Sequence, residues 1–164
     1  MLIIRNPGHR STLHNVAPGA FTRANFGGSA HPSSRITSST PDGVLGGMWA
    51  KMSGNYEVDI VNGTAVVGLF LNDAVGSPFE NTPAVASGKI TVMVGQGEYE
   101  TDIYETTKED TTALATAWSA SIGLPLYVSD FGLLTTENTG TPIVGYVTKA
   151  PSTGDPFLGF RTVL

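Results

Sequence analysis

Glycine and proline recur along almost the whole chain, and their spacing limits the folds that this sequence can form. The 164 residues include 20 glycines and 10 prolines, and the longest stretch without either runs from Glu98 to Ile122. Proline removes a backbone donor, and glycine lowers helix stability. Long helices are therefore excluded almost everywhere outside that stretch, and we expect a chain built mainly from strands and turns.

Alternation of apolar and polar residues predicts strands most clearly between residues 123 and 150. The segment from Leu124 to Val128 alternates in the way that is typical of a strand with one buried face. Two further short strands are expected at 133–135 and 143–147, separated by turn residues. Gly145 interrupts the second of these, and a glycine inside a strand usually marks a bulge or the close approach of another backbone segment.

The same reasoning predicts strands elsewhere in the chain, at 56–61, 65–71, 89–94, 98–104 and 157–164. Asn62-Gly63 is a strong turn dipeptide, so we expect the first two of these strands to form a hairpin. The short segment from Gly95 to Gly97 predicts a second hairpin, between the third strand and the fourth.

One helix is predicted, from Glu109 to Ser121. Thr107 is a candidate cap, and an apolar face is formed by Leu114, Ala117, Trp118 and Ile122. Trp49 and Trp118 are expected to be core anchors. Together, these elements predict a mainly β fold: a small β-barrel or sandwich with one short helix and a long extended N-terminal arm.

The expected arm covers residues 1–47, and the β-barrel body covers residues 48–164. Prolines and glycines interrupt the arm too often for a helix, and its large apolar side chains follow no period. These few side chains return much less free energy than the backbone entropy that ordering the arm would cost. We therefore expect the arm to become ordered on a partner, most simply by adding a strand to a neighbouring sheet edge.

The charge of the chain is distributed unevenly. Up to Thr40 there are four arginines, three histidines and no carboxylate, whereas the rest has five basic and fourteen acidic residues. The two parts carry +4 and −9, which together give the net charge of −5. A basic arm on an acidic body indicates an acidic binding surface for the arm. The predicted partner-binding residues of the arm are its arginines and two phenylalanines: Arg5, Arg10, Phe21, Arg23, Phe26 and Arg35.

Three carboxylates alternate along one predicted strand: Glu98, Glu100 and Asp102. Because side chains two residues apart in a strand share a face, all three are expected to project from the same side. One interpretation is a solvated outer face. The other is a docking site for the arginine-bearing arm of a neighbouring subunit or for a basic patch on a partner.

No pattern in the sequence predicts catalytic or cofactor chemistry. The histidines at positions 9, 14 and 31 match no metal-ligand spacing, and none lies in the body to activate a hydroxyl nucleophile. No phosphate-binding loop or dinucleotide fingerprint is present. The chain has no cysteine and no apolar run of membrane-spanning length. We therefore expect a soluble protein made in the cytosol, with no enzymatic activity, no bound metal or cofactor, and no nucleic-acid or membrane partner.

From about Ala65 to the end, the order of segments resembles the head decoration, or capsid cement, proteins of tailed bacteriophages. The matching segments are AVVGLFL with Gly68, ALATAW, GLPLYVSDFGLLTT, a Gly-Thr-Pro turn, IVGYV and a terminal apolar strand. In that family a barrel lies on the outside of the capsid lattice, and an extended terminal arm reaches across neighbouring major capsid proteins. The resemblance assigns no role to individual residues.

The resemblance implies a structural virion protein that is made in the host cytoplasm and binds the outer capsid surface. Its partners would be the major capsid protein and further copies of itself, as a trimer or a dimer. The alternative function is a carbohydrate- or host-surface-binding β-module of a virion fibre. That alternative needs exposed aromatic side chains in the body, and the sequence offers Tyr99, Tyr127 and Phe131 as candidates.

Overall fold

A computed structural model describes residues 1–6, 10–13, 43–54, 57–60, 65–71, 73–75, 90–107 and 112–163. The fold is mainly β, as the sequence predicted, and in these ranges it contains thirteen strands and one short 3-10 helix. The elements are β1 (Leu2–Asn6), β2 (Arg10–Leu13), β3 (Gly43–Val44), β4 (Trp49–Gly54), β5 (Glu57–Ile60), β6 (Gly68–Phe70), β7 (Ala74–Val75), β8 (Ile90–Met93), β9 (Glu98–Thr101), η1 (Trp118–Ala120), β10 (Pro125–Val128), β11 (Leu134–Thr135), β12 (Gly145–Lys149) and β13 (Leu158–Thr162).

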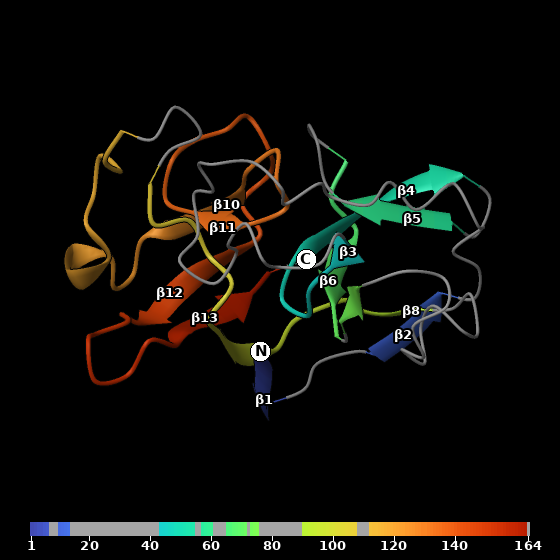
Figure 1. Ribbon diagram of the computed structural model, residues 1–164, viewed down its shortest axis with the longest axis horizontal. Coiled ribbons are helices and arrows are strands. Elements are labelled where there is room, and N and C mark those ends of the chain that lie inside the picture. The colour runs from blue at the N-terminus through green and yellow to red at the C-terminus, as the bar shows by residue number, and fades with distance from the viewer. Residues whose placement is uncertain are drawn as a thin grey trace.

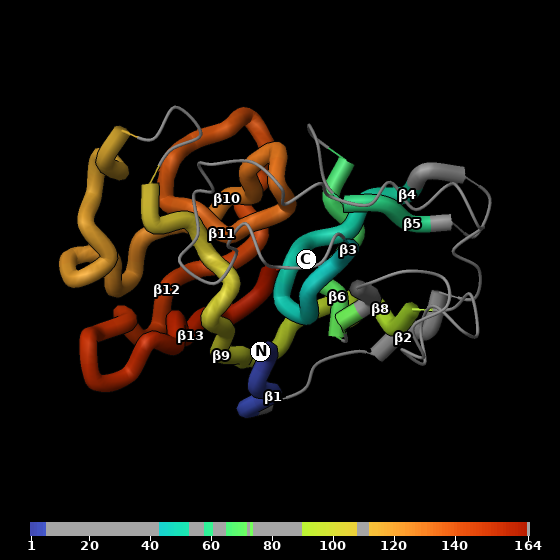
Figure 2. The backbone as a smooth tube through the Cα atoms, in the orientation of Figure 1, coloured from blue at the N-terminus to red at the C-terminus, as the bar shows by residue number. Residues whose placement is uncertain are grey.

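The described strands form two main sheets. One has six strands in the order β1-β9-β13-β12-β10-β11, and the other has five in the order β2-β8-β6-β4-β5. β3 and β7 form a small separate pair. Figure 1 shows the larger sheet on the left and the five-stranded sheet on the right, and Figure 2 follows the chain between them.

One face of the five-stranded sheet points toward the larger sheet. Trp49 of β4 lies opposite Leu69 of β6, and Leu69 lies opposite Met93 of β8. All three side chains are buried in one cluster with Tyr99 and Phe160 of the larger sheet. This row of side chains is therefore the main packing contact between the two sheets.

The opposite face of the five-stranded sheet is also buried. Ala50 and Phe70, which directly follow Trp49 and Leu69, point to this side because side chains alternate along a strand. They belong to a second cluster, whose other members include Val44, Leu45, Met48, Ile103 and Leu133. The middle of the sheet is thus covered on both sides, which explains why adjacent residues of β4 and β6 are apolar.

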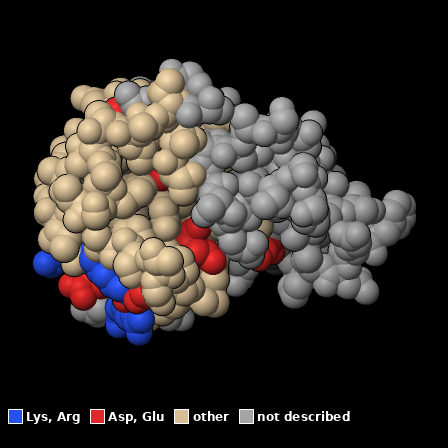
Figure 3. All heavy atoms as spheres, turned by 60° about the vertical axis from the view of Figure 1, so that its left-hand side comes forward, with Lys and Arg blue, Asp and Glu red and all other residues tan. Residues whose placement is uncertain are grey.

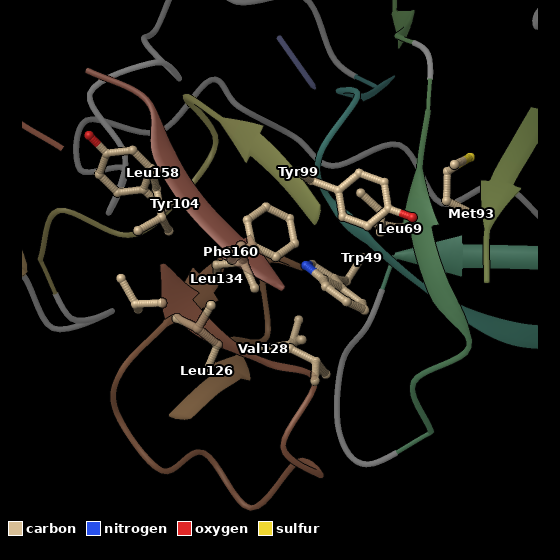
Figure 4. Close-up of a cluster of buried hydrophobic side chains, with 12 residues drawn as sticks. Trp49, Leu69, Met93, Tyr99, Tyr104, Leu126, Val128, Leu134, Leu158 and Phe160 are labelled. Carbon is tan, nitrogen blue, oxygen red and sulfur yellow. The ribbon is translucent and has the colours of Figure 1, made fainter. Parts of the chain in front are cut away.

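Aromatic rings hold the sheets together at the centre of the molecule. Tyr99 of β9 lies opposite Phe160 of β13, with 5.6 Å between the ring centroids. Phe160 also contacts Trp49 of β4, with 6.5 Å between the ring centroids. Figure 4 shows these three rings among the aliphatic side chains that surround them. Trp49 is therefore a core anchor, as predicted, and is only 1% exposed.

Gly145 confirms the close backbone approach that was expected at its position. A Cβ atom there would lie 2.4 Å from the carbonyl oxygen of Arg161 on the neighbouring strand β13. The residue is paired with both Thr162 and Leu126. A side chain at this position would therefore force β12 away from β13.

Both predicted hairpins are wrong, because the strands pair with other neighbours. β5 and β6 pair with opposite edges of β4, so β4 separates the two strands that flank Asn62-Gly63. β8 and β9 belong to different sheets, and the segment from Gly95 to Gly97 carries the chain from one sheet to the other. Both errors arise from pairings between segments that are distant in sequence, which local turn residues do not reveal.

The helix predicted over Glu109–Ser121 is also wrong within the described residues. Residues 112–117 are irregular, and only Trp118–Ala120 forms a single 3-10 turn. Ala117 and Ile122 of the expected apolar face are exposed, so a helix here would have no complete face to bury. Short helices depend on such packing for their stability.

Trp118 fixes this irregular segment to the body. Its indole nitrogen donates a hydrogen bond of 2.6 Å to the carbonyl oxygen of Glu105. Its ring packs edge-on against Tyr104, with 5.2 Å between the ring centroids. Trp118 is half-buried, and it anchors a loop rather than the expected helix.

The described parts of the predicted arm are paired with the sheets of the same chain. β1 is antiparallel to β9, β2 is antiparallel to β8, and Val44 and Leu45 are buried in the core. Residues 7–9 and 14–42 lie outside the described residues. These described parts differ from the expectation of an arm that is separate from the body and needs a partner, because β8 and β9 supply the backbone hydrogen bonds.

Candidate interaction surface

The acidic strand β9 shows the alternation that the sequence predicted. Tyr99 and Thr101 are buried on the inner side, whereas Glu98 is exposed. The Glu100 side chain is 13% exposed, and Asp102, which follows the strand, is 21% exposed. The carboxylates of β9 therefore lie on the outer face of the six-stranded sheet.

Glu100 is the centre of a chain of four charged side chains, which we call the β9 ion-pair network: Arg5, Glu100, Lys149 and Asp155. The Nη2 atom of Arg5 lies 2.9 Å from Oε2 of Glu100, and Nζ of Lys149 lies 3.2 Å from the same oxygen. Nζ of Lys149 also lies 2.7 Å from Oδ2 of Asp155. In Figure 3, basic and acidic side chains gather at the lower part of a described face that is otherwise largely uncharged.

Gly159 allows Lys149 to reach Glu100. In the register of the sheet, Gly159 lies between these two residues, opposite Glu100 on one side and Lys149 on the other. A Cβ atom at Gly159 would lie 2.6 Å from Cβ of Lys149. The missing side chain therefore leaves the space through which the lysine crosses β13.

Two irregularities in the strands place the cations of the network. In β12 the register shifts between Val147 and Lys149, which turns Lys149 outward although Val147 points into the core. In β1 the register shifts between Ile4 and Asn6, so that Arg5 is the extra residue. Bulges of this kind re-aim side chains, and the one in β12 directs Lys149 toward Glu100.

The pKa shifts in the network favour the charged form of each side chain. The hydrogen bond from Arg5 is the main cause that lowers the pKa of Glu100, and Lys149 lowers it further. The same contact raises the pKa of Arg5. The pKa of Lys149 is raised mainly by Asp155 and then by Glu100, and Lys149 in turn lowers the pKa of Asp155. The network is therefore fully ionised near neutral pH.

Other predicted partner-binding residues are placed only in part. The amino group of Met1 forms an ion pair with Asp102, next to the network. Arg10 begins β2, where its backbone lies opposite Met93. The remaining predicted positions of the arm lie outside the described residues: Phe21, Arg23, Phe26 and Arg35. Of the predicted set, the structure thus brings together Arg5 and Glu100, with Glu98 and Asp102 beside them.

Of the three aromatic candidates of the carbohydrate-binding alternative, one is buried and two are partly exposed. Tyr99 is 1% exposed and packs in the core, so its assignment as an exposed aromatic was wrong. Phe131 is half-buried against the second core cluster, and Tyr127 is also half-buried. Tyr99 points inward for the same reason that Glu98 and Glu100 point outward.

The predicted histidine candidates for metal binding, at positions 9, 14 and 31, lie outside the described residues. Within the ranges that the structure describes, no group of three or more histidine or acidic side chains is arranged to hold a metal ion. The same ranges contain no helix of the length and apolar character that crossing a membrane requires.

Lys149, Asp155 and Gly159 were not among the sequence-predicted site residues. Lys149 follows the end of the strand predicted at 143–147, and its outward direction depends on the bulge. Gly159 was the one available signal, because it interrupts the apolar closing strand. A glycine there indicates a close approach but does not identify the side chain that uses the space.

Neither a protein family nor a curated protein matches this sequence. The class that the structure itself defines is therefore a mainly β protein. Its larger sheet carries the β9 ion-pair network on its outer face, where β1 pairs with β9.

Proposed function

We propose that this protein is a structural virion protein that binds the outer surface of a phage capsid and joins neighbouring major capsid proteins. The proposal starts from the resemblance of residues 65–164 to capsid cement proteins. It assigns no catalytic role to any residue and no cofactor. Under this proposal, the protein would be made in the host cytoplasm and would then be located on the outer capsid surface.

The observation that carries the proposal is the way in which β1 is bound. This basic N-terminal strand lies along the acidic strand β9, pairs with its backbone and directs Arg5 to Glu100. Addition of a strand to a sheet edge, with arginine meeting a carboxylate, is the chemistry that we expected between the N-terminal segment and a partner. In the described residues this contact is made within one chain, and we propose that the rest of the segment uses the same mode of binding on a partner.

The proposed capsid contacts are the arginines and phenylalanines that follow β2: Phe21, Arg23, Phe26 and Arg35. Large aromatic and arginine side chains are those that contribute most often to protein interfaces. Each copy would make modest contacts, and many copies on one particle would reinforce one another. Each capsid would therefore gain stability from the summed contacts rather than from any single one.

The test uses the full-length protein and expanded capsids of the tailed phage that carries its gene. We expect electron microscopy to show the protein as regular density outside the shell, and sedimentation to show saturable binding. The double variant Arg23→Ala/Arg35→Ala should bind more weakly, whereas Arg161→Ala, which removes an exposed arginine of the body, should bind normally. Circular dichroism would establish that both variants are folded. Absence of wild-type binding would overturn the proposal.

A further inference from the structure

The strand β1 lies along one edge of β9, which we call the β9 edge. Its backbone pairs along β9, with Leu2 opposite Thr101 and Ile4 opposite Tyr99. Leu2 and Ile4 are half-buried and pack against the core cluster that contains Tyr99. The β9 edge therefore binds a strand that has two apolar side chains at alternate positions, followed by an arginine that reaches Glu100.

Glu100 keeps a positively charged partner when β1 leaves β9. Arg5 and Lys149 share the same oxygen of Glu100, and Lys149 is also held by Asp155. Removal of Arg5 thus leaves Glu100 paired with Lys149 rather than as an uncompensated carboxylate. On the other edge of β9, β13 remains paired along the whole strand. The pairing of β9 with β13 and the ion pair between Glu100 and Lys149 therefore do not depend on β1.

β1 itself is held less firmly than the strands inside the sheet. It is the outermost strand of the six, and among the described strands it pairs with β9 alone. The Arg5 side chain is 56% exposed, and the apolar side chains of β1 are only half-buried. Segments with few buried contacts open locally without unfolding of the whole protein. Opening of β1 would expose β9 as a free sheet edge.

We propose that β1 is exchanged between copies, so that Leu2–Asn6 of one copy pairs with β9 of a second copy. The second copy is the fitting occupant because its N-terminal strand carries the same apolar pair and the same arginine. Every contact made within one chain is then remade between two chains, which is the basis of domain swapping. The inference concerns the protein alone and stands or falls independently of capsid binding.

Disulfide trapping tests the exchange directly. The chain has no cysteine, so introduced cysteines are its only thiols. Asn6→Cys and Glu98→Cys place one thiol on β1 and one on β9 at positions that are register partners. The two single variants, with tags of different mass, are mixed at high concentration and oxidised. We expect a covalent heterodimer, with mass spectrometry identifying a link between positions 6 and 98.

The control replaces Glu98→Cys by Asn138→Cys, an exposed position that follows β11 at the opposite end of the six-stranded sheet from β1. This mixture reports random collision, and we expect several-fold less heterodimer from it. A yield from Asn6→Cys with Glu98→Cys that does not exceed this background would overturn the proposal. The double variant Asn6→Cys/Glu98→Cys at low concentration verifies that the pair can close within one chain.

Light scattering of the wild-type protein is a second, independent test of whether copies associate through β1. We expect the mass to rise above that of a monomer as concentration increases. The variant Ile3→Pro/Ile4→Pro, which removes two backbone donors of β1, should stay monomeric. A wild-type protein that is monomeric at all concentrations would overturn the inference, and so would an oligomer that this variant leaves unchanged.

Discussion

At the scale of single residues, the outer face of the larger sheet depends on a residue with no side chain. Gly159 leaves room for Lys149 to cross β13 and reach Glu100. The four charged side chains of the β9 ion-pair network come from three different strands and a turn. A local packing requirement, rather than the charges alone, therefore decides whether the network forms.

We predict that Gly159→Ala destabilises the protein by about 1–3 kcal/mol, as is usual when a methyl group is forced into occupied space. The new Cβ atom would lie 2.6 Å from Cβ of Lys149, which has to move. Gly154→Ala is the matched control, because no atom of the described residues lies within 4 Å of a Cβ atom there. Chemical denaturation of the two variants measures the difference. Equal free energies of unfolding would contradict this account of Gly159.

The second prediction concerns acid stability. The folded-state pKa of Glu100 lies below its ordinary value of 4.5. Around and below that pH, the unfolded chain therefore binds more protons at this position, so stability is lost as the pH falls through the folded-state pKa. Because solvent screens the exposed partners, we expect a loss below about 1 kcal/mol.

Denaturation curves measured between neutral pH and pH 3 provide the test. Glu100→Gln should show a shallower loss of stability over this range than the wild type, since it has no proton to gain at this position. Glu98→Gln, on the exposed end of the same strand, serves as the comparison. If Glu100→Gln and the wild type lost stability in parallel, the ion pairs of Glu100 would not contribute to acid stability.

At the scale of elements, position in the sheet separates β1 from β13. β13 lies between β9 and β12, and its Leu158 and Phe160 are fully buried. Within the described part of the chain, β1 has a neighbouring strand on one edge only, and its apolar side chains are half-buried. The two strands pair with the same partner, β9, from opposite sides, so they form a natural comparison.

We predict that the backbone amides of β1 exchange with solvent much faster than those of β13. Opening of β1 requires only local separation from β9, whereas release of β13 requires the sheet to come apart. Hydrogen exchange followed by mass spectrometry or NMR resolves the two strands. Similar protection of β1 and β13 would show that the N-terminal strand opens only when the whole protein unfolds.

At the scale of the whole molecule, the sequence predicted strands better than it predicted their partners. Short-range alternation located β10 and β13, and the glycine in β12 marked a real close approach. β4 was missed because Trp49 and Ala50 are buried on opposite faces, which removes the alternation. Its absence from the prediction led directly to the wrong hairpin, since β4 lies between β5 and β6.

The candidate site was predictable to the same limited extent. Alternation is a local property, so the outward direction of Glu98 and Glu100 followed from the sequence. The pairing of Glu100 with Lys149 did not, because it depends on a register shift in a strand distant along the chain. Arg5 meets Glu100 through the pairing of β1 with β9, two segments that are also far apart in the sequence. Long-range strand pairing and the register shift in β12 therefore determine which charges meet.

The order of strands in the larger sheet has a consequence for synthesis on the ribosome. β13 is the last strand of the sheet to be translated, yet it is inserted between β9 and β12, and its Phe160 packs against Tyr99 and Trp49. Until it emerges, the nascent polypeptide exposes two unpaired strand edges and an aromatic surface, which are features that invite aggregation. A stop codon placed before residue 158 should therefore yield an insoluble product, although most of the chain would already have been made.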